Sequence, residues 1–364
     1  MGERQRTVEN VVIIMLNFYK GKRVFVTGHT GFKGSWLCVI LAMTGAEVTG
    51  FSLPPTGEPN LYALADIDDL VDSRFGDVRD LDALKAVFDS AQPEIVFHLA
   101  AQPIVRESYR DPVGTYSTNV MGTVHLLDCV RQSDCVHSVL NVTTDKVYRN
   151  NEWCWGYREN DPLGGYDPYS NSKSCSELVT HSYVDSFLAK QNVAVSTARA
   201  GNVIGGGDFA KDRIIPDCVR AACAREPIGI RNPYSVRPYQ HVFEPLFAYL
   251  LIARRQYEDA SLMGNYNIGP DECDCTTTGE LTELFCRCWG EGLRWENRAE
   301  ANAPREANYL RLDCGKLKST FGWRPRWNIE RAVEKTVEWT KAWRDGENVR
   351  EQMERQIGNY IAEE

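Results

Sequence analysis

A glycine-rich turn between an apolar strand and an apolar helix constrains this fold more than any other feature of the sequence. The apolar run 24–27 leads into the turn, and the apolar run 36–41 follows it. The turn itself contains Gly28, Gly31 and Gly34. Glycines let the backbone turn tightly and approach a ligand closely, and the positive end of a helix dipole stabilises a phosphate. This arrangement therefore predicts a dinucleotide-binding loop.

Short apolar strands alternate with longer helical stretches up to about residue 200. Besides the first strand, strands are predicted at 47–51, 95–99, 139–143 and 194–198. Such alternation is typical of a parallel sheet with helices on both faces. We therefore expect an α/β fold, a Rossmann-like doubly wound parallel sheet with a smaller, partly interleaved C-terminal domain.

Two long helices are predicted beside this sheet. Val120, Val124 and Leu127 repeat with helical spacing, so residues 113–131 are expected to form a helix that buries these side chains. A second helix is expected over residues 169–190.

Beyond residue 200 the sequence becomes rich in loops and arginines, which predicts a change of domain. Residues 1–16 are expected to be a disordered extension, and residues 17–200 the dinucleotide-binding domain. Residues 201–345 would mainly bind the second ligand, with some segments returning to the first domain. Residues 346–364 would form a helical tail.

The charge excludes several kinds of partner. With 41 basic and 50 acidic residues the net charge is -9, which argues against nucleic acid and anionic membranes as partners. The apolar run 11–16 is too short to span a bilayer or to serve as a signal core. We therefore expect a cytoplasmic protein.

The twelve cysteines are scattered along the chain and predict reduced thiols rather than a disulfide frame. Two pairs, Cys273 with Cys275 and Cys286 with Cys288, have one residue between their members. Zinc sites usually have two to four, so we expect no metal.

Two groups of polar residues carry the predicted chemistry. Thr144, Asp145 and Lys146 directly follow the strand predicted at 139–143. Tyr169 and Lys173 are four residues apart, so they share one face of a helix. An ammonium beside a phenol lowers the pKa of the tyrosine, which can then take the proton of an alcohol while a hydride leaves the same carbon.

The pair Asp145 and Lys146 indicates a second reaction after the oxidation. A ketone acidifies the neighbouring C–H, so Lys146 could remove that proton while Asp145 protonates a departing hydroxyl. Alcohol oxidation alone needs no such pair. Burial would keep a carboxyl group protonated and the adjacent lysine charge would oppose this, and the sequence leaves that opposition open.

These motifs together resemble the nucleotide-sugar 4,6-dehydratases of the extended short-chain dehydrogenase/reductase family. The lysine at position 146 resembles the CDP-glucose branch, because dTDP-glucose relatives have glutamate there. The resemblance runs from about residue 20 to about residue 345 and is carried by the segments 28–36, 98–102, 116–123, 155–159, 164–173, 199–208 and 237–241.

The resemblance implies a reaction, a substrate and an assembly. NAD would be the cofactor and CDP-glucose the substrate, with oxidation at C4, loss of water across C5 and C6, and return of the hydride to C6. A homodimer built from the helices at 113–131 and 169–190 is implied, possibly a tetramer.

It also implies the residues of the site. Thr144, Asp145, Lys146, Tyr169 and Lys173 would be catalytic. The expected cofactor contacts are Gly28, Thr30, Gly31, Phe32, Lys33, Gly34, Asp77, Val78, Leu99, Ala100, Ala101, Asn119, Thr143, Tyr169, Lys173 and Arg199. The expected substrate contacts are Asn202, Arg213 and Arg237, whose guanidinium groups would pair with the diphosphate.

Several alternatives remain open. The second strand ends without the acidic residue that commonly holds the adenosine ribose of NAD, and also without an arginine for the phosphate of NADP. A nucleotide-sugar 4-epimerase, a reductase, or a dehydratase of another nucleotide hexose would share most of these motifs. A catalytically silent NAD-binding protein is a further alternative, since fold alone does not fix activity.

Overall fold

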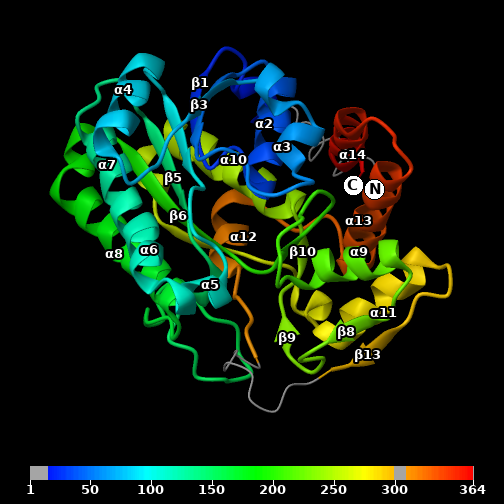
Figure 1. Ribbon diagram of the computed structural model, residues 1–364. Helices are drawn as coiled ribbons and strands as arrows, with labels where there is room; N and C mark the ends of the chain where they lie inside the picture. The colour runs from blue at the N-terminus through cyan, green and yellow to red at the C-terminus, as the bar shows by residue number, and fades with distance from the viewer. Residues whose placement is uncertain (1–14, 299–308, 364) are drawn as a thin grey trace, which may run out of the picture.

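The computed structural model describes residues 15–298 and 309–363 of the 364-residue chain (Figure 1). Residues 1–14 of the expected N-terminal extension lie outside the described residues. Met15 is buried in the main core, so the folded chain includes the last two residues of that expected extension.

A seven-stranded parallel sheet forms the centre of the molecule, in the order β11-β6-β5-β4-β1-β2-β3. This confirms the predicted doubly wound fold. The order reverses between β1 and β4, so the carboxyl ends of these strands flank a ligand crevice. The strands are β1 (Arg23–Thr27), β2 (Glu47–Ser52), β3 (Asp72–Phe75), β4 (Ile95–His98), β5 (Ser138–Val142), β6 (Ala194–Ala200) and β11 (Asn265–Ile268).

No strand is predicted at β3, and its composition explains why. Its sequence, Asp-Ser-Arg-Phe, has little apolar character, and the strand lies at the sheet edge with mostly exposed side chains. An edge strand of this kind has no buried alternation for a sequence pattern to detect.

Helices cover both faces of the sheet, each over its own apolar core (Figure 1). Alternate side chains of β1 divide between them: Val24 and Val26 face one core and Phe25 the other. The first core includes α2 (Phe32–Thr44), α10 (Phe243–Glu258), α12 (Gly315–Phe321) and α14 (Val349–Ala362). The second includes α4 (Leu81–Ala91), α7 (Gly122–Arg131) and α8 (Pro168–Ser186).

The helix expected at 113–131 is interrupted by a π-helical turn. It consists of α6 (Pro112–Tyr116), the π-turn η2 (Ser117–Met121) and α7. The wider turn changes the phase of the helix, so Val120 and Val124 are only partly buried while Leu127 is buried. The predicted stripe is therefore fully buried at one of its three positions.

A smaller region with its own core lies beside the sheet (Figure 1). It contains α9 (Ile214–Ala224), β8 (Ile228–Ile230), α11 (Thr278–Trp289), β13 (Trp295–Asn297) and α13 (Ile329–Arg344). Between α9 and α11 the chain returns to the main sheet as α10 and β11.

The shorter elements connect these parts. They are α3 (Leu61–Leu64), α5 (Val105–Arg110), the pair β7 (Val203–Ile204) and β10 (Gln240–His241), and the pair β9 (Val236–Arg237) and β12 (Thr276–Thr277). None of the helices in the described ranges is long and apolar enough to cross a membrane.

Candidate active site

The glycine loop between β1 and α2 is shaped for a ligand with a phosphate group. Gly28 has a φ of +76°, and a Cβ there would lie 2.7 Å from the Ala100 nitrogen. A Cβ on Gly34 would overlap the Gly28 carbonyl. Gly31 precedes α2 without a side-chain cap, so the first amides of the helix are open to an anion. These residues fit the pyrophosphate of a dinucleotide.

Polar groups next to this loop occupy the ends of β2 and β3. Thr30 Oγ1 lies 2.8 Å from Ser52 Oγ, so a hydroxyl stands where an acidic residue often holds the adenosine ribose. Asp77, just after β3, is held by Arg79, with Oδ2 2.6 Å from Arg79 Nη2. The hydrogen bonds from Arg79 lower the pKa of the Asp77 carboxyl.

A buried network fixes the loop after β4 against the glycine loop. Thr27 Oγ1 accepts the N–H groups of Leu99 and Ala100 at 3.2 Å each and is hydrogen-bonded to His98. The amide of Asn119, in the π-turn, bonds the backbone of Gln102 in this loop, with its Oδ1 2.8 Å from the Gln102 nitrogen. These bonds hold 99–101 beside Gly28.

The residues after β5 form a hydrogen-bonded group. Thr144 Oγ1 donates to Asp145 Oδ1 at 2.9 Å, and Lys146 Nζ donates to the same oxygen at 2.9 Å. Lys146 Nζ also donates to Asn202 Oδ1 at 3.3 Å. Asp145 has no exposed surface, and among the described residues its Oδ2 has no hydrogen-bond partner. The predicted acid, base and substrate contact are thus adjacent.

Tyr169 joins this group from the first turn of α8. Burial raises the pKa of Tyr169, although the charge of Lys146 and a hydrogen bond with Thr144 oppose the rise. Lys173 Nζ donates to the Val142 carbonyl at 3.1 Å, and burial lowers the pKa of Lys173 to about 8. That Lys173, together with the positive nicotinamide, lowers the pKa of this tyrosine stays a prediction, and without the cofactor the cost of burying a phenolate dominates.

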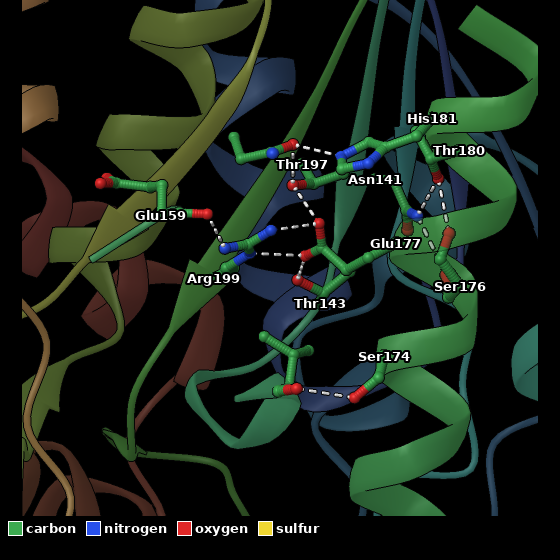
Figure 2. Close-up of polar contacts among 12 residues, drawn as sticks. Asn141, Thr143, Glu159, Ser174, Ser176, Glu177, Thr180, His181, Thr197 and Arg199 are labelled. Atoms are coloured by element: carbon green, nitrogen blue, oxygen red, sulfur yellow. Dashed lines mark hydrogen bonds and ion pairs between the residues drawn. The ribbon is translucent and has the colours of Figure 1, made fainter. Parts of the chain in front are cut away.

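A buried ion pair beneath the site supports Thr143 and α8. Glu177 lies one turn after Lys173, and its carboxylate accepts hydrogen bonds from Nε and Nη2 of Arg199, each at 2.9 Å (Figure 2). Thr143 and Thr197 donate to the same carboxylate at 2.5 and 2.7 Å. Burial would raise the pKa of Glu177, but the hydrogen bonds and charge of Arg199 outweigh it and the pKa is lowered.

The guanidinium of Arg199 is committed to this network. Besides Glu177, it donates through Nη1 to Tyr148 Oη and to the Glu159 carbonyl, both at 2.9 Å. The sequence analysis expects Arg199 to contact the cofactor, and this stays a prediction. The side chain of Arg199 links β6 to α8 and to the loop before it.

Further cations reach the site from both sides. Burial, with the charges of Lys173 and Arg213, lowers the pKa of Lys33 in the glycine loop to about 7. Lys33 Nζ lies 5.9 Å from the ring centre of Tyr249 on α10. Arg213, at the start of α9, pairs with Asp208 at 2.9 Å. Lys33, an expected cofactor contact, and Arg213, an expected substrate contact, therefore lie in a region with several cationic side chains.

Arg237 is the last residue of β9. It is buried in β9, where its Nη1 donates to the Val236 carbonyl at 2.9 Å. The strand pairs with β12 in the smaller region.

Glu177 and Tyr249 are site residues that the sequence analysis does not single out. Glu177 could have been found, because it follows Lys173 by four residues on one helix. Tyr249 lies on a distant helix that packs under the sheet, and no spacing relates it to the motifs.

Within the part of the chain that the structure describes, no group of three or more His, Cys, Asp or Glu side chains could hold a metal ion.

Comparison with known proteins gives a consistent picture. Residues 25–336 match the family model of GDP-mannose 4,6 dehydratase. The chain is 49% identical over 352 residues to CDP-glucose 4,6-dehydratase of Salmonella typhimurium, covering 95% of this chain and 98% of the relative. It is 28% identical to a probable dTDP-glucose 4,6-dehydratase of Sinorhizobium fredii, covering 87% and 92%.

Two solved structures share the fold. One is dTDP-glucose 4,6-dehydratase from Bacillus anthracis in complex with NAD, with a TM-score of 0.74, 22% identity and coverage of 89% of this chain and 98% of that one. The other is UDP-glucose 4-epimerase from Thermus thermophilus in complex with NAD, with a TM-score of 0.75, 25% identity and coverage of 87% and 98%.

Proposed function

The chain belongs to the GDP-mannose 4,6 dehydratase family, and we propose that it converts CDP-D-glucose to CDP-4-keto-6-deoxy-D-glucose in an NAD-dependent reaction. The observation that carries this proposal is the hydrogen-bonded group of Thr144, Asp145 and Lys146 beside Tyr169. An epimerase has no need for such an acid and base. The 49% identity to a CDP-glucose 4,6-dehydratase supports the choice of nucleotide.

Bound NAD supplies the acceptor and later donor of the hydride, and its positive ring favours a phenolate nearby. Tyr169 takes the proton of the C4 hydroxyl, and Thr144 holds the C4 oxygen. Lys146, as a neutral amine, takes the C5 proton that the C4 ketone has acidified. Asp145 gives a proton to the C6 hydroxyl, which leaves as water. Lys146 then returns its proton to C5.

The surroundings support these roles. Asp145 is fully buried, and its Oδ1 is hydrogen-bonded to both Thr144 and Lys146, which fixes the proposed acid beside the proposed base. Lys146 keeps 29% of its side-chain surface exposed and contacts Asn202, so it reaches the space between the sheet and the smaller region. Arg213, and Arg237 further into that region, are the proposed partners of the substrate diphosphate.

An isotope label tests the route. With deuterium at sugar C4, the label should appear at C6 of the product, and the product should be lighter than the substrate by one water. Return of the label to C4 without loss of water would identify an epimerase. A panel of CDP-, dTDP-, UDP- and GDP-glucose should give turnover with CDP-glucose in clear preference, and equal turnover of all four would contradict the choice of base.

We also propose a homodimer formed through α6, η2 and α8. These elements lie side by side and expose Val113, Met121 and Leu178, which are 78%, 44% and 57% exposed. Large apolar side chains grouped in this way commonly mark an interface. Leu178→Arg should shift the protein from dimer to monomer in analytical ultracentrifugation, whereas Leu53→Arg, at an exposed site after β2, should not. A mass of four chains would indicate a tetramer.

The cysteines support a reducing compartment for this enzyme. All twelve have free thiols, and Cys38, Cys218 and Cys314 are buried in apolar surroundings. Burial raises the pKa of the Cys38 thiol to about 12, which makes it unreactive. We therefore propose a cytoplasmic location.

A further inference from the structure

The short turn that carries the proposed acid and base is weakly bonded within itself. This turn, η3 (Asp145–Val147), begins after Thr144 and ends before Tyr148. The Lys146 nitrogen lies 3.4 Å from Thr144 Oγ1, and the Val147 nitrogen lies 3.4 Å from the Thr144 carbonyl oxygen. Both distances exceed the usual range of about 2.7–3.2 Å for such hydrogen bonds. The turn therefore depends on its surroundings to keep one conformation.

The two ends of this turn are attached to one buried ion pair. On the β5 side, Thr143 Oγ1 donates to Glu177 at 2.5 Å. On the other side, Tyr148 Oη accepts a hydrogen bond from Arg199 Nη1 at 2.9 Å. Arg199 donates in turn to Glu177 through Nε and Nη2, each at 2.9 Å (Figure 2). The segment from Thr143 to Tyr148 and the ion pair thus form a closed ring, and the Tyr148 hydroxyl is one of its links.

Tyr148 itself is firmly held. The side chain is 2% exposed, and its hydroxyl donates to Asn267 Oδ1 on β11 at 2.6 Å. Its ring stacks on Tyr157 with the ring centres 5.2 Å apart, and the Arg199 guanidinium carbon lies 5.0 Å from its centre. The hydroxyl accepts one hydrogen bond and donates another, so both of its capacities are used. A side chain held in this way can fix the end of the turn.

The position of the turn matters for the proposed dehydration of CDP-glucose, on which this inference rests. Lys146 has to reach the C5 proton while Asp145 reaches the hydroxyl on C6, the next carbon. A displacement of about 1 Å in a reacting group can slow a reaction by about 10²-fold. Tyr169 and Lys173, which serve the oxidation, lie outside the turn on α8. An error in the position of the turn would therefore affect elimination more than oxidation.

We propose that Tyr148 is a positioning residue for the elimination, because its hydroxyl closes the ring that holds Asp145 and Lys146 in place. It acts through the turn and not on the sugar. Without this hydroxyl the Tyr148 end of the turn is loosened, while the Thr143 end stays bonded to Glu177. Oxidation at C4 continues, elimination slows, and reduced NAD accumulates during turnover.

Tyr148→Phe tests this role, because it removes the hydroxyl and keeps the stacked ring. The NAD-loaded variant is mixed with CDP-glucose, reduced-nicotinamide absorbance follows the oxidation, and product mass after quenching follows the elimination. We expect oxidation at the wild-type rate, elimination slower by about tenfold or more, and more reduced NAD than in the wild type. Tyr19→Phe is the matched control, since it removes a buried hydroxyl that bonds the Leu250 carbonyl at 2.7 Å in the main core. It should keep wild-type kinetics.

The same measurement can overturn the proposal. If Tyr148→Phe slows oxidation and elimination by one common factor, or changes neither, the hydroxyl does not position the acid and base. Should this variant not fold, Ser174→Ala gives the same test with the same expected result, because Ser174 Oγ donates to the Val147 carbonyl at 2.7 Å at the same end of the turn. A wild-type enzyme that does not convert CDP-glucose would reject the proposed function instead, so the two failures are distinct.

Discussion

Single residues at the end of β5 divide the proposed chemistry between them. Asp145 Oδ1 is shared by Thr144 and Lys146, and Asn202, just after the neighbouring strand β6, bonds the same lysine. Lys146 keeps part of its surface exposed while Asp145 is fully enclosed. The amine can therefore reach a bound sugar, and the carboxyl group is protected from water.

Replacing Lys146 should separate oxidation from elimination. Lys146→Met is expected to bind CDP-glucose and reduce bound NAD, which is visible as reduced-nicotinamide absorbance, but to lose dehydration by about 10²-fold or more. Product mass measures the dehydration. Lys85→Met, which removes an exposed lysine paired with Asp89 on α4, serves as the control and should keep full turnover. Full turnover by Lys146→Met would exclude the lysine as the base.

The buried pair of Glu177 and Arg199 should be sensitive to loss of one partner. Glu177→Gln leaves the Arg199 charge enclosed without a counter-charge, which costs about 3–5 kcal/mol of unfolding free energy. Urea denaturation measures this loss. Glu258→Gln, which breaks a partly exposed pair with Arg254 on α10, should cost less than about 1 kcal/mol. Similar losses in both variants would show that the buried pair has no special weight.

At the scale of elements, the sequence predicts what depends on local pattern. The glycine loop, the five interior strands of the sheet and the position of α8 follow from turn residues and apolar runs. The π-turn before α7 is not predictable in this way, because it comes from packing of Asn119 against the loop after β4. The contacts of Tyr249 and Arg199 likewise depend on which elements the fold brings together.

The glycine loop gives a prediction for cofactor binding. A Cβ on Gly34 would overlap the Gly28 carbonyl, so Gly34→Ala should displace the loop and weaken NAD binding by about tenfold or more, a loss of about 1.4 kcal/mol. Titration followed by protein fluorescence measures the affinity. Gly358→Ala in α14 meets no atom within 4 Å and should leave the affinity unchanged. Unchanged affinity in Gly34→Ala would contradict the proposed position of the pyrophosphate.

At the scale of the whole molecule, buried histidines connect stability to pH. Burial lowers the pKa of His29 to about 4 and the pKa values of His98 and His241 to about 3, against 6.5 in an unfolded chain. The unfolded state therefore binds more protons between about pH 6.5 and 4, and these groups lose their stabilising effect as the pH falls through that range. Glu244 acts in the opposite direction, because burial raises its pKa to about 7.

A histidine variant tests this dependence. In His98→Asn the slope of unfolding free energy against pH, between about pH 4 and 6, should be lower by about 1.4 kcal/mol per pH unit than in the wild type. Urea denaturation at several pH values gives both slopes. Parallel curves for the two proteins would show that His98 contributes nothing to acid sensitivity, whatever the variant costs at neutral pH.

The return of the chain from the smaller region to the sheet has a consequence for recombination between relatives. Because α10 and β11 come from residues 243–268, a single crossover near residue 200 would pair one parent's strands with a foreign edge strand and covering helix. A chimaera that exchanges ligand preference therefore needs two separate grafts, one on each side of this returning segment. An exchange between relatives can therefore transfer a new specificity only if residues 243–268 stay with the sheet of their own parent.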